Sequence, residues 1–316
     1  MSWMDFIERD PVPWLLDPTN PSARLLTLRE IFDRSEETLS EEYDRLLAWQ
    51  PVRALRRHWD SHNFWGRAGN PYFGGAAGTF GTLYLLTQLG VPNIPEVEST
   101  CIDLLDNGRR EDGRFGPEGT AAAPWLAYSG MVLHIMIHFG YEDDPRTQSA
   151  WGRAIQAVHA DPERLDCPTE DMACRAGAIK LLKALLSRDS ATRTTADESV
   201  IDFLCEYLLK HSWDWQDADR GWMQCRFPRF YDTDLIEFCH VLSETPYRAH
   251  PRCQETAQQM IGLQDASGRW SKMKATPAFS EERINQPSRW LTLEAVHSLM
   301  QIYGDETYAA RGSRSA

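Results

Sequence analysis

The sequence predicts an all-α protein folded as a single α/α toroid, a closed arrangement of helical hairpins with an inner and an outer layer. Apolar residues recur at spacings of three and four along the chain, whereas alternating runs of β-branched residues are nearly absent. Five strongly apolar segments of similar character end at residues 90, 140, 187, 243 and 304. Apolar residues make up 42% and charged residues 25% of the chain, the usual balance of a folded globular protein.

The helices can be placed one after another from this periodicity. The first opens at Pro21 and Ser22, because proline suits the first turn of a helix, and the leucines that follow form its apolar face together with Ile31 and Phe32. Further helices are expected near residues 40–49, 51–59, 76–89, 95–107, 122–139, 145–159, 171–187, 195–210, 231–243, 249–263 and 287–303.

The hairpins repeat along the chain, and this repetition predicts how they assemble. Each unit has one strongly apolar helix, a turn and a more amphipathic helix. Stacking the units buries the apolar helices against one another, and six units can close into a ring of inner helices covered by outer ones. We therefore expect one domain over residues 1–304, with the first hairpins at about 12–60, the repeats at about 60–304 and a flexible tail at 305–316.

A second repeat lies in the loops after the amphipathic helices. Residues 264–270 have the form Q-x-x-x-G-x-W, residues 110–115 are a variant that ends in Phe115, and residues 216–222 are a looser version. A glutamine can bond free carbonyls at a helix end, and glycine permits a tight reversal. The aromatic ring can then pack over the next hairpin, so we expect Trp270 to fasten neighbouring repeats together.

These loops and the hairpins of roughly fifty residues resemble the QW repeats of squalene cyclases, class II terpene cyclases and the β subunits of protein prenyltransferases. The stretch at residues 14–29 also looks like the start of bacterial prenyltransferase and squalene oxidase repeat proteins. The resemblance covers roughly residues 60–304 and implies the α/α toroid. Because toroids of this kind host unrelated reactions, it does not by itself imply one activity.

Charge and composition exclude several classes of partner. The chain has 33 Lys and Arg against 46 Asp and Glu, a formal net charge of −13, so nucleic acid is not an expected partner. No apolar run is long enough for integral membrane association, and the first residues lack a secretory signal. Seven scattered cysteines without a C-x-x-C pair favour reduced thiols and a cytoplasmic protein. No phosphate-binding glycine loop is present, so we expect no cofactor.

The leading catalytic candidates are Asp232 and Asp234, at the expected start of an inner helix. Class II cyclases place a protonating D-x-D-D motif at such a position, and this chain has Leu235 in place of the last aspartate. In the cyclases, burial raises the pKa of one carboxyl, which then delivers a proton to an alkene. The alternative is that one of the two aspartates only caps the helix.

The same aspartates are also candidate ligands for a metal ion. Protein prenyltransferases bind zinc with a D-x-C pair and a later histidine, and His297 follows Asp232-x-Asp234 at the corresponding distance. An aspartate stands where the thiolate should be, and this set suits zinc poorly. We therefore expect no metal, and Asp232, Asp234 and His297 as the ligands if one binds. Cys225, Cys239 and His240 lie near in sequence and could supplement them, with buried packing as the alternative for the two cysteines.

A third group of candidates combines Cys167, Cys174 and His134, with His138 one helical turn further on. Their residue types are similar to those of the linalool dehydratase isomerase type of α/α barrel, which moves water and protons without a cofactor. Inert cysteines and core histidines are the alternative. Further residues expected at the inner helix starts or in the aromatic loops are Tyr128 and Tyr231 as catalytic groups, and Trp65, Tyr72, Phe73, Trp125 and Trp290 as substrate-binding groups.

Together these features lead to a functional hypothesis. We expect a cofactor-independent acid/base enzyme of the cyclase, isomerase or dehydratase (lyase) type, acting on an isoprenoid-like or other apolar small molecule in the cavity of the toroid. The alternatives are a toroid that binds a ligand or peptide without catalysis, and a zinc-dependent prenyltransferase-like enzyme. Association as a homo-oligomer stays open.

Overall fold

The structure is a computed structural model that describes residues 2–59, 65–67, 69–111, 113–117, 125–160, 172–210, 221–276, 279 and 281–304. The side chains at 125, 160 and 172–174 lie outside this description. Within it the protein is all-α, as predicted. The described residues contain one short antiparallel ladder, in which β1 (Ser271–Lys272) pairs with β2 (Gln286–Pro287) and Ser271 lies opposite Pro287.

The observed helices follow the expected ranges closely. Prolines occupy the first turn of α2, α4, α6 and α12, where the missing N–H costs no helical hydrogen bond. The bounds are α1 (Val12–Leu15), α2 (Pro21–Glu30), α3 (Ser40–Ala48), α4 (Gln50–Arg57), α5 (Thr79–Gln88), α6 (Pro95–Asn107), α7 (Trp125–His138), α8 (Pro145–Ala160), α9 (Met172–Leu186), α10 (Thr195–Lys210), α11 (Leu235–Ser243), α12 (Pro251–Ile261) and α13 (Arg289–Tyr303).

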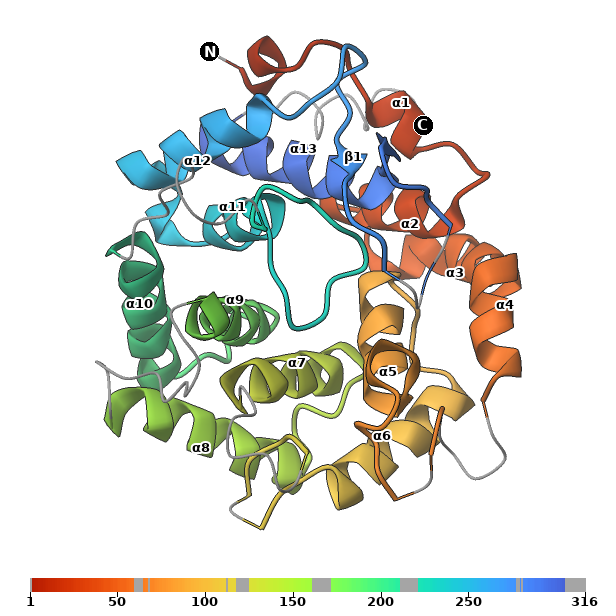
Figure 1. Ribbon diagram of the computed structural model, residues 1–316, viewed down its shortest axis with the longest axis vertical. Helices are drawn as coiled ribbons and strands as arrows, with labels where there is room; N and C mark the ends of the chain where they lie inside the picture. The colour runs from red at the N-terminus through yellow and green to blue at the C-terminus, as the bar shows by residue number, and fades with distance from the viewer. Residues whose placement is uncertain are drawn as a thin grey trace.

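The helices lie in two layers around a central loop (Figure 1). In this view α5, α7, α9, α11 and α13 are inside, while α6, α8, α10 and α12 are outside. We call the first group, together with α2, which packs on α13, the inner helices. The inner helices are mostly apolar because they are buried on all sides. In α5, for example, every residue from Thr79 to Thr87 is buried. Gly130 lets α7 approach α9 closely, since a Cβ there would lie 2.5 Å from the backbone nitrogen of Leu181.

The loop at residues 264–270 shows how the repeated motif is used. The Gln264 amide donates to the carbonyl oxygens of Ile261 and Phe6, at 3.1 and 2.9 Å, so it ties the end of α12 to the N-terminal segment. Gly268 has a φ of +68°, and a Cβ there would lie 2.0 Å from the carbonyl oxygen of Arg9. The buried Trp270 ring donates its N–H to the Met260 carbonyl at 2.7 Å. The motif therefore joins α12 to the chain's first residues.

Replacing Trp270 by phenylalanine tests this account of the motif. Trp270→Phe removes the ring N–H bond to the Met260 carbonyl, which keeps the Leu263 N–H as a donor, and it creates a small void, so we expect a loss of about 1–3 kcal/mol in the free energy of unfolding. Urea denaturation followed by circular dichroism measures it. Ile284→Val is the control, because Ile284 is 47% exposed and should change stability by less than about 0.5 kcal/mol. Equal midpoints for the two variants would contradict the account.

The centre of the molecule is filled by the chain itself. The loop before α11, residues 221–234, crosses the middle of the view in Figure 1. Its Phe227 stacks on Trp290 of α13, with ring centroids 4.3 Å apart and planes 3° from parallel. Its Arg229 is buried and bonds Gln88 at the end of α5 through backbone N–H and C=O groups, at 2.9 and 2.8 Å. Its Tyr231 packs against Phe80 and Tyr128 near the starts of α5 and α7, so the loop reaches both ends of α5.

Candidate functional site

A polar pocket lies among the inner helices, and Phe227 of the loop at residues 221–234 forms part of its wall. It consists of two cavities of about 120 and 390 Å³, which share Arg29, Glu30, Lys183 and His240 in their walls and therefore adjoin. We call these two cavities together the histidine pocket. Four of the nine histidines of the chain line it: His134, His138, His240 and His297.

Two of these histidines come from α7, one turn apart, and their hydrogen bonds fix their tautomers. His138 Nε2 lies 2.9 Å from the Val91 carbonyl oxygen, so this nitrogen carries the proton and Nδ1 has the lone pair. The Ser187 hydroxyl donates to the Lys183 carbonyl and therefore accepts from His134 Nδ1 at 2.8 Å, which leaves the lone pair of His134 on Nε2. Both rings therefore present one free acceptor nitrogen.

Burial keeps these rings neutral near pH 7. It lowers the pKa of His138 to about 4 and that of His134 well below 6.5, and the Lys183 ammonium lowers the pKa of His134 further. Burial also lowers the pKa of His240, with a further contribution from the His297 ring. Neutral imidazoles can accept a proton or bind a cation.

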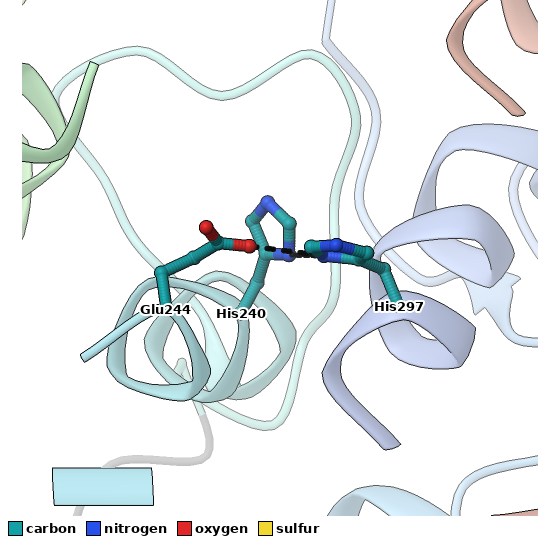
Figure 2. A group of neighbouring side chains, drawn as sticks. All are labelled: His240, Glu244 and His297. Carbon is teal, nitrogen blue, oxygen red and sulfur yellow. Dashed lines mark hydrogen bonds and ion pairs between the residues drawn. The ribbon is translucent and has the colours of Figure 1, made fainter. Parts of the chain in front are cut away.

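The outer part of the pocket gathers His240, Glu244 and His297. His240 and Glu244 are one turn apart at the end of α11, and His297 faces them from α13 (Figure 2). His297 Nδ1 lies 3.2 Å from Glu244 Oε1 and 3.5 Å from His240 Nδ1. The side chain of Glu244 is 39% exposed and that of His297 9%, so the cluster is open on the glutamate side.

Charged groups complete the lining of the histidine pocket. Arg29 pairs with Glu30 at 3.2 Å, and Glu294 pairs with the buried Arg229 at 2.6 Å. Burial raises the pKa of Glu294, opposed by Arg229. Within the described part of the chain, the Lys183 ammonium has no hydrogen bond or ion pair, and it is the free positive charge of the pocket.

Asp234, a leading candidate from the sequence, lies away from this pocket in a saturated site. Its carboxylate caps α11 through the N–H groups of Ile236 and Glu237, at 3.0 and 3.1 Å. It also accepts the Arg226 backbone N–H at 2.9 Å and two Arg229 side-chain N–H groups at 2.8 and 3.0 Å. A carboxylate has about four lone-pair positions. Five donors occupy them all, which leaves none for a substrate and agrees with the capping alternative.

Asp232 lies at the surface, unlike the buried Asp234. Its side chain is 63% exposed and pairs with Arg226. The structure therefore does not bring the two aspartates into one cavity, nor does it place them with His297, whose neighbours are His240 and Glu244. The metal-ligand set expected from the sequence therefore differs from the observed group. Asp234 lies at the start of α11, whereas His297 packs beside His240 in the last turn of that helix.

The predicted aromatic residues mostly form packing contacts. Tyr72, Phe80, Tyr128 and Tyr231 make one cluster, with the Tyr128 and Tyr231 ring centroids 4.9 Å apart. The Tyr72 hydroxyl donates to the Gly108 carbonyl at 2.7 Å, and burial raises the pKa values of Tyr72 and Tyr231 above their usual range. These rings therefore pack on one another near the helix starts, where catalytic and substrate-binding groups were expected from the sequence.

The remaining predicted residues divide into three groups. Trp65 is buried and donates its ring N–H to the Leu55 carbonyl at 2.8 Å, while Phe73 is 52% exposed. Trp290 and His134 do line the histidine pocket. Cys167 lies outside the described residues, as do the side chains of Cys174 and Trp125.

Lys183 and Glu244 were not predicted from the sequence, and His240 was considered only as a supplementary metal ligand. A usable signal existed for Glu244, since a histidine and a glutamate four residues apart share one face of a helix. Lys183 carried no such signal. The buried ion pair of Lys180 with Glu237, in which the ammonium lies 2.6 and 2.7 Å from the two carboxylate oxygens, was not predicted either.

In the described residues, no helix combines the length and apolar character needed to span a bilayer. The chain has also been compared with protein-family models, curated proteins and solved structures. None of the three comparisons finds a match, so the family resemblance rests on the sequence motifs alone.

Proposed function

We propose that this chain is an α/α toroid enzyme that performs acid–base chemistry, of the isomerase or lyase type, on a small polar molecule in the histidine pocket. The toroid assignment is supported by the repeated hairpins, the Q-x-x-x-G-x-W loop and the two helical layers in Figure 1. The observation that carries the function is the convergence of four histidines, a free lysine and three carboxylates from the inner helices. Titratable groups that face a shared pocket are typical of catalytic sites.

His134 is the best-placed proton acceptor. Its Nδ1–H is held by Ser187, so its Nε2 lone pair is presented in a defined orientation. Its ring is neutral because burial lowers its pKa, and a neutral imidazole can remove a proton from a bound molecule. Lys183 lies in the same wall and can stabilise the negative charge that develops.

The lining favours a polar substrate over the apolar one that the family resemblance implies. An isoprenoid in this pocket would bury Lys183 and the Arg29–Glu30 pair without replacing their hydrogen bonds to water, which costs free energy. A molecule with oxygen or nitrogen groups can supply those bonds. The larger cavity, at about 390 Å³, falls within the ~300–1,000 Å³ usual for small-molecule sites.

Thermal denaturation in the presence of small molecules tests this proposal. We would screen hydroxy acids, amino acids and sugar acids alongside isoprenoid alcohols. A polar ligand at 100 times its Kd should stabilise the fold by about 2.7 kcal/mol, a rise in Tm of roughly 5 °C. Lys183→Met should abolish the rise, whereas Lys210→Met, which changes an exposed lysine of α10, should keep it. Stabilisation by the isoprenoid alcohols alone, or in Lys183→Met, would contradict the proposal.

A further inference from the structure

We infer that His240, Glu244 and His297 form a binding site for one divalent transition-metal ion of the zinc class. Their ligand atoms all lie within 4.8 Å of one another, and Figure 2 shows the three side chains converging on one point. This inference is independent of the proposed function, because metal binding is measured without a substrate. It also departs from the metal-free protein that the sequence led us to expect.

The distances suit a shared ion. Zinc binds imidazole nitrogen at ~2.0–2.1 Å in a tetrahedron, so two ligand atoms on one ion lie roughly 3.3 Å apart. In the structure, His297 Nδ1 lies 3.2 Å from Glu244 and 3.5 Å from His240. Two of the three separations therefore match a shared ion, and the third, between Glu244 and His240, lies within 4.8 Å. Two imidazoles and one carboxylate are a donor set that zinc and similar ions accept.

Proton counting supports the same conclusion. His297 Nδ1 has two neighbours, and a single ring N–H can serve only one of them well. If it donates to Glu244, it cannot also donate to the His240 nitrogen 3.5 Å away. A bound cation could be shared by all three ligand atoms at once.

Gln301 supplies a partner for the outer nitrogen of a metal-bound His297. Its side-chain amide lies 3.3 Å from His297 Nε2, which must carry the proton once Nδ1 binds a metal. Turning the amide by 180° places the Gln301 oxygen there as the acceptor. Such a bond to the outer nitrogen fixes the ring and raises its affinity for the metal.

The ion would have a vacant coordination position next to the proposed substrate site. Three protein ligands on zinc leave a fourth position for water or substrate. All three ligand residues line the cavity of about 390 Å³, together with Lys183 and Arg29. A metal-bound water there would be close to the groups assigned above to acid–base chemistry.

Zinc titration of the chelator-treated full-length chain tests the inference. Isothermal titration calorimetry should give one Zn²⁺ per chain, and Co²⁺ should give visible absorption bands of a tetrahedral site. His297→Ala and Glu244→Gln should each weaken Zn²⁺ binding by at least about 10–100-fold. His250→Ala, which changes an exposed histidine at the start of α12, should bind as the unmodified chain does.

Glu244→Gln keeps the inference testable if His297→Ala fails to fold, because Glu244 is partly exposed and its amide is nearly the same size. Two results would overturn the inference. One is an unmodified chain that binds no Zn²⁺. The other is binding that survives in Glu244→Gln and is lost instead in His134→Ala, which would place the ion on the histidine pair of α7.

Discussion

Glu237→Gln is expected to lower the free energy of unfolding by about 3–5 kcal/mol, because it leaves the Lys180 ammonium buried without its counter-charge. The two side chains are 0% and 1% exposed, and their contacts of 2.6 and 2.7 Å join α9 to α11. Urea denaturation measured by tryptophan fluorescence gives the value. Glu41→Gln is the matched control: its carboxylate is 85% exposed, and its pair with Arg45 should contribute less than about 1 kcal/mol.

The double variant Lys180→Met/Glu237→Leu separates charge from packing. Replacing both partners by apolar residues removes the unpaired charge, so most of the lost stability should return. A double variant as unstable as Glu237→Gln would show that shape, and not charge, is the cause.

The same pair makes part of the stability depend on pH. Burial opposes ionisation of Glu237, but Lys180 and then Arg229 outweigh it and lower its pKa to about 2 from an unfolded value of 4.5. Its contribution, about 3 kcal/mol, is therefore complete above pH 4.5 and is lost as the pH falls toward 2. The double variant should show a correspondingly weaker loss of stability over this range.

Asp234→Ala is expected to destabilise the protein by about 4–6 kcal/mol, the second large effect. The change removes the cap of α11, which typically contributes ~1 kcal/mol, and it takes one of two counter-charges from the buried Arg229 guanidinium. Asp234→Asn keeps the capping oxygen but loses the charge, so its loss should be intermediate. Chemical denaturation of the unmodified chain, Asp234→Asn and Asp234→Ala gives the order of their free energies of unfolding.

Asp232→Asn is the control for this series and also tests the sequence-based hypothesis. Because Asp232 is 63% exposed, its ion pair with Arg226 should contribute less than about 1 kcal/mol. If Asp234→Asn were as stable as Asp232→Asn, the carboxylate of Asp234 would not be held in the network described, and it would return as a candidate proton donor.

The helices were predictable from the sequence because their signal is local. Apolar spacing, prolines in first turns and glycine at the turns placed α5 to α13 within a few residues. The cap at Asp234 was also among the stated alternatives, since Asp is favoured before a helix. These features could therefore be predicted from short stretches of the sequence.

The position of the pocket was not predictable in the same way. Residues 221–234 have no helical periodicity, and nothing in their composition indicates that Phe227 and Arg229 fill the centre of the molecule. The cluster of His240 with His297 joins two helices that are distant in sequence, and only the packing of α11 on α13 brings them together. Contacts of this kind depend on the whole fold.

Nuclear magnetic resonance of the histidine rings tests the central claim most directly, namely that ligands bind in the histidine pocket. Ring ¹H–¹⁵N correlations would be recorded while a mixture of small polar metabolites is added. The account predicts that the shifts concentrate on His134, His138, His240 and His297, whereas the exposed His159 and His250 stay unchanged. The account would be contradicted if the metabolites left all four pocket rings unshifted, or if the changes appeared only at the exposed rings.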